Sequence, residues 1–126
     1  MKLAIIGSRN LCVNLSEFIN ILPDEIITGG AVGVDYSAYL FAKRNNLNIS
    51  IIRPNYSKFG KIAPLIRNNK IIDSCDSVLA IWDGYSKGTV HAIRVAKRKN
   101  KPVKVIVIKN KFEYKIYDSC SQTRLF

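Results

Sequence analysis

Residues 25–45 read EIITGGAVGVDYSAYLFAKRN, and this stretch decides the fold that the sequence predicts. Its first four residues, EIIT, have the character of a short buried strand and run directly into Gly29-Gly30. Residues 35–45 then read as a helix. A short strand, a glycine-rich turn and a helix form one βα unit, and repeated βα units build a parallel sheet.

The same alternation extends along the chain in both directions. Strands are expected at residues 3–6, 48–52, 77–82 and 103–108, and helices at 63–74 and 86–100. A short helix capped by Asn14 or Ser16 should run to Leu22. Residues 53–62 are expected to form a loop, and the alternating residues 112–117 are compatible with an added edge strand. Because βαβ crossovers are right-handed, these elements predict an α/β, Rossmann-like, doubly wound and mostly parallel five-stranded sheet, with helices on both faces.

Composition indicates one globular domain in a reducing compartment. The 126 residues, 48% of them apolar, suit a single domain with its own core, here expected at about 3–108 with a C-terminal extension over 109–126. Cys12, Cys75 and Cys120 contain no C-x-x-C pair, which predicts neither a disulfide framework nor a zinc site. Residues 3–6 form too short an apolar run for a signal peptide or a membrane span. We therefore expect a cytoplasmic protein with no membrane partner.

The net charge of +11 points to phosphate but does not say in what form. Basic residues crowd the C-terminal third, and a basic surface attracts both polynucleotides and small nucleotides. A solubilising surface explains the same charge equally well. Charge alone therefore does not identify a partner.

Three of the expected strands end in residues suited to anion binding. Because the carboxyl ends of parallel strands meet at one edge, where such sheets bind ligands, these loops should converge. Glycines admit close approach of a ligand to the backbone, and helix N-termini bind phosphate through free amides. Arg9 would add a charged, forked donor. The candidate ligand-binding residues are Gly7, Ser8, Arg9, Gly29, Gly30, Ala31, Gly33, Asp35, Asp83, Ser86, Gly88 and Thr89.

The loops lack two common nucleotide signatures. Gly29-x-x-x-Gly33 is neither the G-x-G-x-x-G dinucleotide fingerprint nor a P-loop with its lysine and hydroxyl. We therefore predict no redox cofactor and no Walker-type triphosphatase. Asp35 and Asp83 are too few to define a metal site, so no metal is predicted.

An ordered set of motifs carries a family resemblance. The segments are residues 6–9 (IGSR), 28–35 (TGGAVGVD) with Ala38, 67–68 (RN), 76–84 (DSVLAIWDG), 86–89 (SKGT), Ala96 and 101–103 (KPV). With them the sequence resembles the SLOG superfamily, the nucleotide-binding fold shared by Smf/DprA and LOG proteins, and within it the small YspA-like proteins. The resemblance spans residues 3–108 and implies a Rossmann-like fold with a nucleotide pocket built from these loops.

The resemblance also suggests roles for individual residues. Arg9 and Arg67 look like phosphate or ribose contacts, so Arg67 joins the candidates, although it also fits a solvated helix residue. Asp35 would either bind a ribose hydroxyl or cap its helix. Related folds often dimerise, which makes a homo-oligomer an expected partner arrangement.

Three functions stay open, of which a sensor or sequestering protein for a nucleotide-derived ligand is the first. A LOG-like hydrolase is the second, although Thr89-Val90-His91-Ala92 lacks the glutamate of the LOG pattern. His91 or Asp83 would then supply acid–base chemistry, unless His91 is structural and Asp83 a turn residue.

Single-stranded DNA binding is the third open function. Stacking of bases would need aromatic side chains beside the basic ones. The candidate stacking residues are not interleaved with the basic cluster; they are Tyr56, Phe59, Tyr85, Tyr114 and Tyr117.

Overall fold

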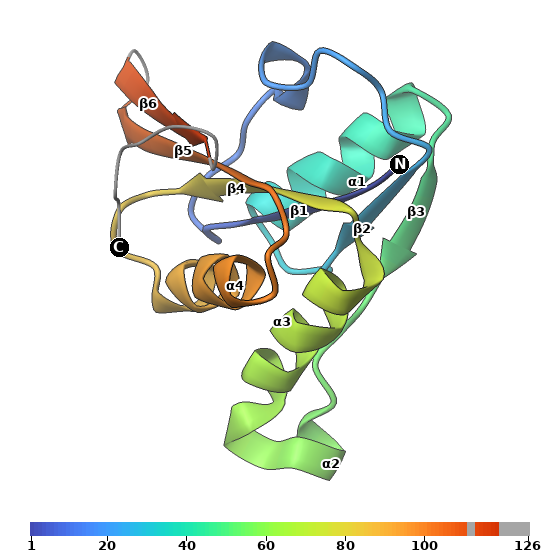
Figure 1. Cartoon of the computed structure of the whole chain (residues 1–126), viewed down its shortest axis with the longest axis vertical. Coiled ribbons are helices and arrows are strands. Elements are labelled where there is room, and N and C mark those ends of the chain that lie inside the picture. The colour runs from blue at the N-terminus through green and yellow to red at the C-terminus, as the bar shows by residue number, and fades with distance from the viewer. Residues whose placement is uncertain (111–112, 119–126) are drawn as a thin grey trace.

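A six-stranded sheet forms the centre of the protein in the computed structural model, which describes residues 1–110 and 113–118 (Figure 1). The strand order is β3-β2-β1-β4-β5-β6. The bounds are β1 Lys2–Gly7, β2 Glu25–Thr28, β3 Asn48–Ile51, β4 Ser77–Trp82, β5 Val103–Asn110 and β6 Glu113–Asp118. The first five strands are parallel and β6 runs antiparallel to β5. The predicted five-stranded parallel core and the added edge strand are both confirmed. Phe112 of the expected edge strand, with residue 111 and residues 119–126 of the expected extension, lies outside the described residues.

Helices cover both faces of the sheet, as predicted. Helix α1 (Val34–Arg44) and the 3-10 helix η1 (Leu15–Glu17) lie on one face, and α3 (Ala63–Ser74) and α4 (Lys87–Arg98) lie on the other. The short α2 (Tyr56–Phe59) and the 3-10 helix η2 (Gly60–Ile62) precede α3 and project away from the sheet (Figure 1).

Two local predictions were wrong. The short helix expected to reach Leu22 is only the single turn η1, for which Asn14 is the N-cap. Ile21 and Leu22 are exposed and add no packing that would extend it. The loop expected over 53–62 contains α2 and η2. The side chain of Asn55 starts α2 by accepting a hydrogen bond from the Lys58 amide at 3.2 Å.

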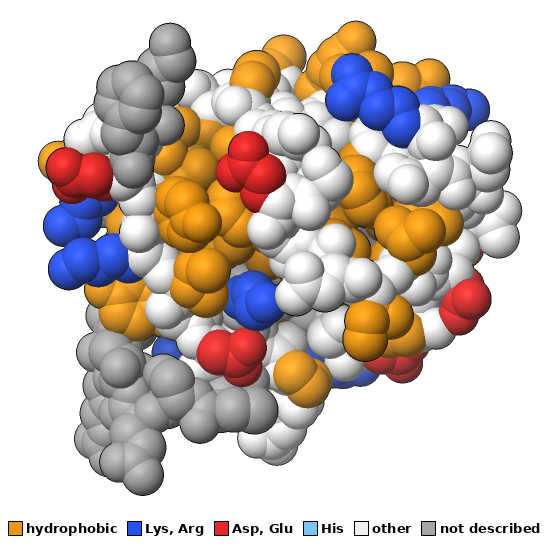
Figure 2. Space-filling model, turned by 90° about the horizontal axis from the view of Figure 1, so that it is seen from above, with side chains coloured by type: hydrophobic (Ala, Val, Ile, Leu, Met, Phe, Trp, Pro, Cys, Tyr) orange, Lys and Arg blue, Asp and Glu red, His pale blue; other side chains and the backbone are white. Residues whose placement is uncertain are grey.

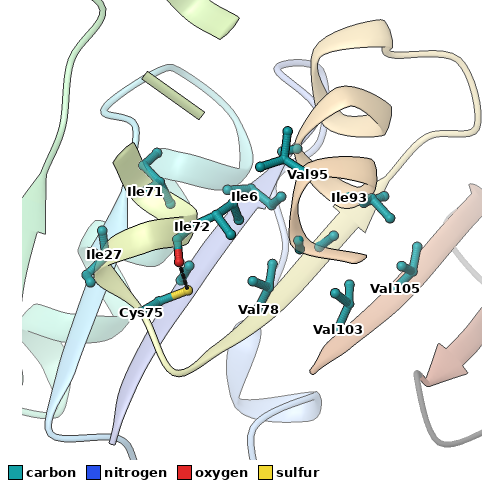
Figure 3. Close-up of a cluster of buried hydrophobic side chains, with 14 residues drawn as sticks. Ile6, Ile27, Ile71, Ile72, Cys75, Val78, Ile93, Val95, Val103 and Val105 are labelled. Atoms are coloured by element: carbon teal, nitrogen blue, oxygen red, sulfur yellow. Dashed lines mark hydrogen bonds between the residues drawn. The ribbon is translucent and has the colours of Figure 1, made fainter. Parts of the chain in front are cut away.

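The alternation of strand residues divides the core into two layers. In β1, Ala4 and Ile6 face α3 and α4, whereas Leu3 and Ile5 face α1. Figure 3 shows the α3–α4 layer, where side chains from both helices meet those from β1, β2, β4 and β5. Burying both faces of a strand explains why these strands read as continuous apolar runs.

The strand order positions the functional region. From β1 the chain winds outward through β2 to β3, then returns to place β4 on the other side of β1. Ile6 pairs with Ala80 and Gly7 with Ile81, so β1 and β4 end side by side. Their following loops lead to opposite faces of the sheet. Such a switch in winding leaves a crevice beyond the carboxyl ends of the strands.

Candidate functional site

A cavity of about 420 Å³ occupies the carboxyl edge of the sheet at this switch. This volume lies within the usual range for small-molecule sites. The structure brings eleven of the thirteen predicted residues into its lining, and only Gly30 and Gly33 lie outside it. The eleven are Gly7, Ser8, Arg9, Gly29, Ala31, Asp35, Arg67, Asp83, Ser86, Gly88 and Thr89.

Ser8, in the loop after β1, connects this loop to β4, to the residue after β4 and to α1. Its amide donates to the Ile81 carbonyl at 3.0 Å, and its own carbonyl accepts from the Val34 amide at 3.3 Å. Its buried hydroxyl oxygen accepts a hydrogen bond from the Asp83 amide at 3.0 Å. The loop after β1 is therefore fixed to both β4 and α1.

Gly33 lies outside the cavity because it packs between loops. Its φ of 78° favours glycine, and a Cβ there would overlap the carbonyl groups of Ser8 and Arg9. Gly30 is likewise packed against Ile51 and Arg53, and its carbonyl accepts from the Arg53 guanidinium at 3.0 Å. Both glycines shape the loop rather than line the cavity.

Asp35 is a buried carboxylate at the floor of the loop after β2. It accepts a hydrogen bond from the Ala31 amide at 3.1 Å, so it holds this loop instead of capping its own helix, whose N-cap is Gly33. Burial raises the pKa of Asp35, while the Ala31 amide and the positive charge of Arg67 act in the opposite direction.

Arg67 reaches from α3 to the end of β2. Its Nη1 donates to the Gly29 carbonyl at 2.9 Å and its Nε donates to the Asn68 Oδ1 at 3.2 Å. Burial lowers the pKa of Arg67, which the charge of Asp35 partly offsets, but a guanidinium stays charged at neutral pH. A half-buried cation therefore lines the cavity, and Arg67 is not a solvated surface residue.

Asp83 organises the turn between β4 and α4. Its Oδ1 accepts hydrogen bonds from the Tyr85 and Ser86 amides, both at 2.8 Å, and its Oδ2 accepts from the Ser86 hydroxyl at 3.1 Å. Desolvation alone would raise the pKa of Asp83, but these hydrogen bonds together lower it. Since the Ser86 side chain is engaged by Asp83, the first turn of α4 has no side-chain cap. The N-terminus of α4, the positive end of its helix dipole, therefore lies at the cavity, where Gly88 and Thr89 form part of the lining.

Arg9 differs from Arg67 in being exposed. It lies at the rim, and its side chain makes no hydrogen bond or ion pair with any other residue in the described part of the chain. An uncommitted guanidinium at the mouth of a cavity is available to an anion.

His91, Trp82 and Tyr85 lie near the end of β4 and the start of α4 but outside the cavity lining. His91 is on the α3 side of α4, and its Nδ1 lies 3.1 Å from the Asn68 Nδ2. Trp82 packs against the core and donates its indole N–H to the Ser86 carbonyl at 3.1 Å. Tyr85 is 87% exposed on the loop before α4.

Sequence reasoning missed one wall of the cavity, the inner face of α3. Pro64, Asn68 and Ile71 line the cavity together with Arg67. Their positions follow helical i, i+3, i+4, i+7 spacing, which could have found them once one member was assigned. Asn10, Leu65 and Tyr56, the last previously considered only for DNA stacking, complete the mouth.

No family model matches the chain, and a search of curated proteins returned no significant match. None of the helices in the described part of the chain combines the length and hydrophobicity needed to cross a bilayer. Among residues 1–110 and 113–118, no three His, Cys, Asp or Glu side chains cluster as metal ligands.

Proposed function

We propose that this protein binds a nucleotide or nucleotide-derived ligand, ADP-ribose-like or cyclic, in the cavity at the switch point, as a cytoplasmic sensor or sequestering protein of SLOG type. The observation that carries the proposal is the convergence of two guanidinium groups and an uncapped helix N-terminus on one cavity. All three attract phosphate, and they come from three separate parts of the chain: the loop after β1, helix α3 and the start of α4.

Asp35 and Tyr56 suit the ribose and the base of such a ligand. Asp35 lies behind Gly29 and Ala31, where a carboxylate accepts hydrogen bonds from hydroxyls of a ribose. Tyr56, 56% exposed at the mouth, offers a ring face to a base. Phosphate at the guanidinium groups, ribose near Asp35 and base toward Tyr56 together describe one nucleotide.

Hydrolysis of the ligand has weaker support than binding. The Asp83 carboxylate is ionised and committed to the turn before α4, and His91 is outside the lining. Of the carboxyl groups among the described lining residues, Asp35 is the one whose pKa is raised, because its burial outweighs its hydrogen bonds. A hydrolase would therefore depend on Asp35 as its acid or base, and Asp35 already accepts a hydrogen bond from the Ala31 amide.

Single-stranded DNA binding ranks third. The aromatic candidates lie on separate elements, with Tyr56 and Phe59 on α2, Tyr85 before α4, and Tyr114 and Tyr117 on β6. On the face shown in Figure 2, Lys and Arg side chains are separated by hydrophobic and uncharged groups. A stacking strip for bases needs basic and aromatic side chains along one groove.

A binding measurement with a charge-matched control tests the proposal. The full chain is first screened by thermal shift against AMP, ADP-ribose, a cyclic dinucleotide and a short single-stranded DNA. The ligand that stabilises it is then titrated calorimetrically into the wild type, Arg9→Ala and Arg44→Ala. Arg44 is exposed in the last turn of α1, at the other end of that helix from Asp35 and outside the cavity lining, and its loss removes the same charge.

We expect Arg9→Ala to bind about tenfold more weakly or worse, since it loses a charge-assisted hydrogen bond. Arg44→Ala should bind like the wild type, and chromatography should return the ligand intact. Equal affinities of the two variants would refute the placement of the site. A cleaved ligand would instead establish the hydrolase.

A further inference from the structure

The side chain of Asn68 connects the two anion-attracting sides of the cavity. It is buried between α3 and α4, and its Oδ1 accepts from the Arg67 Nε at 3.2 Å. Its Nδ2 lies 3.3 Å from the Gly88 carbonyl and 3.1 Å from the His91 Nδ1. One amide group thus contacts the guanidinium, the first turn of α4 and the single histidine of the chain.

The chemistry of two partners fixes the orientation of this amide. The Arg67 Nε–H can only donate and the Gly88 carbonyl can only accept. Reversing the amide would place two donors together at Arg67 and two acceptors together at Gly88. The Nδ2 therefore points toward His91 and donates to it, which requires a His91 Nδ1 without a proton and hence the neutral Nε2–H tautomer.

We propose that Asn68 and His91 are positioning residues for the cavity: neutral His91 holds the Asn68 amide in the orientation that joins Arg67 to the first turn of α4, and protonation of His91 disrupts this connection. A protonated imidazole carries a hydrogen on both nitrogens. Its Nδ1–H would then oppose the Asn68 N–H, and the amide could satisfy His91 only by turning its oxygen away from Arg67.

The surroundings of His91 agree with a neutral ring. Desolvation lowers the pKa of His91 from its ordinary value, and the positive charge of Arg98, about two turns further along α4, lowers it further. From α3, the charge nearest to the Asn68 amide is that of Arg67, also a cation. Neutral His91 therefore predominates at neutral pH, and acidification is needed to break the connection.

Nuclear magnetic resonance of the full chain without ligand tests the orientation directly. With one histidine in the sequence, the imidazole ¹⁵N signals belong to His91. We expect the Nε2–H tautomer, a titration midpoint below that of a histidine peptide, and an Arg67 Nε–H signal that shifts with the same midpoint. Arg67→Lys identifies this signal by its loss. A dominant Nδ1–H tautomer, or an Arg67 signal that does not follow His91, would overturn the proposal.

Two variants separate positioning from a merely structural role. Asn68→Asp replaces the donor facing His91 by an acceptor, so the pKa of His91 should rise and its Nδ1 should carry the proton. His91→Asn keeps an acceptor near the Nδ1 position but does not titrate, so the Arg67 signal should lose its pH dependence. An unchanged His91 pKa in Asn68→Asp, or an unchanged Arg67 profile in His91→Asn, would overturn the assignment.

The effect on affinity rests on the proposed function and needs a ligand whose own charge is constant. ADP-ribose is the probe, because its pyrophosphate diester lacks the ionisation near pH ~6 of a phosphate monoester. Its affinity should fall by about tenfold as His91 becomes protonated, the effect of one misplaced charged donor, and should stay level in His91→Asn. Binding that is level in the wild type would refute the coupling. If ADP-ribose binds at no pH while the resonance results hold, the proposed function fails for this ligand and the positioning of Arg67 by Asn68 stands.

Discussion

Gly29 is the position where adding one methyl group should most directly disturb the proposed site. A Cβ there would overlap the Arg67 guanidinium and lie 2.9 Å from the Asp35 Oδ2. Because the backbone of Gly29 is not left-handed, the substitution Gly29→Ala acts through this contact and not through backbone strain. The end of Arg67 is the flexible partner, so it must leave the Gly29 carbonyl to which it donates at 2.9 Å.

The magnitude follows from the interaction that is lost. A hydrogen bond from a charged donor contributes about 1.5–3 kcal/mol to stability. Alanine has less conformational freedom than glycine in the unfolded chain, which offsets about 0.4–1 kcal/mol of that loss. The free energy of unfolding measured by urea denaturation should therefore fall by about 0.5–2.6 kcal/mol. Ligand affinity should fall as well, because the guanidinium no longer points into the cavity.

A matched glycine and a double mutant identify the cause. No atom lies within 4 Å of a Cβ at Gly88, which lies in helix α4. Because alanine favours a helix over glycine, Gly88→Ala should raise the free energy of unfolding by about 0.5 kcal/mol or more. In an Arg67→Ala background, Gly29→Ala should cost clearly less than in the wild type. If the cost is the same in both backgrounds, Arg67 is not the group displaced, and the reasoning from this contact fails.

Two further results should follow. Gly33→Ala should destabilise more than Gly84→Ala in urea denaturation, because both residues have positive φ but only Gly33 meets the fixed Ser8 carbonyl, whereas a Cβ at Gly84 meets open space; equal costs would contradict this. Because the hydrogen bonds of Asp83 lower its pKa when folded, its contribution to stability is present above the unfolded pKa and is lost as the pH falls through the folded pKa. Asp83→Asn should flatten this acid limb of the stability profile, and an unchanged limb would contradict the assignment.

The fold was predictable because its signals are local and repeated. Each buried strand reads as an apolar run, and each following turn carries glycine or a capping residue, so strand and helix bounds mostly agree within one or two residues. The failures occurred where tertiary contacts decide. Leu15 and Phe18 pack into the core around η1, but Ile21 and Leu22 are exposed, so nothing packs against a continuation of the helix.

Apart from Arg67, which the family resemblance suggested, the site was predictable only for residues in the segments that follow a strand. Such residues must meet at the carboxyl edge of a parallel sheet, whatever the packing of the helices. Asn68 and Ile71 enter the cavity because α3 lies over β1 and β2, and no local pattern specifies on which face of the sheet a helix lies or which of its sides faces the edge. The hydrogen bonds of Asn68 also depend on α4 and so could not be read from α3 alone.

The glycines of the cavity lining do not all serve the purpose that the sequence suggests. At Gly7 the place of the missing side chain is taken by Val34 and the Ile81 carbonyl, and at Gly29 it is taken by Arg67. Gly88 alone among these three leaves open space beside the cavity. Two of the three glycines therefore exist so that protein groups can approach one another, and only the third is shaped for a ligand. A glycine-rich loop at a strand end thus indicates tight convergence of loops first, and the ligand is indicated by the cations and helix terminus that this convergence brings together.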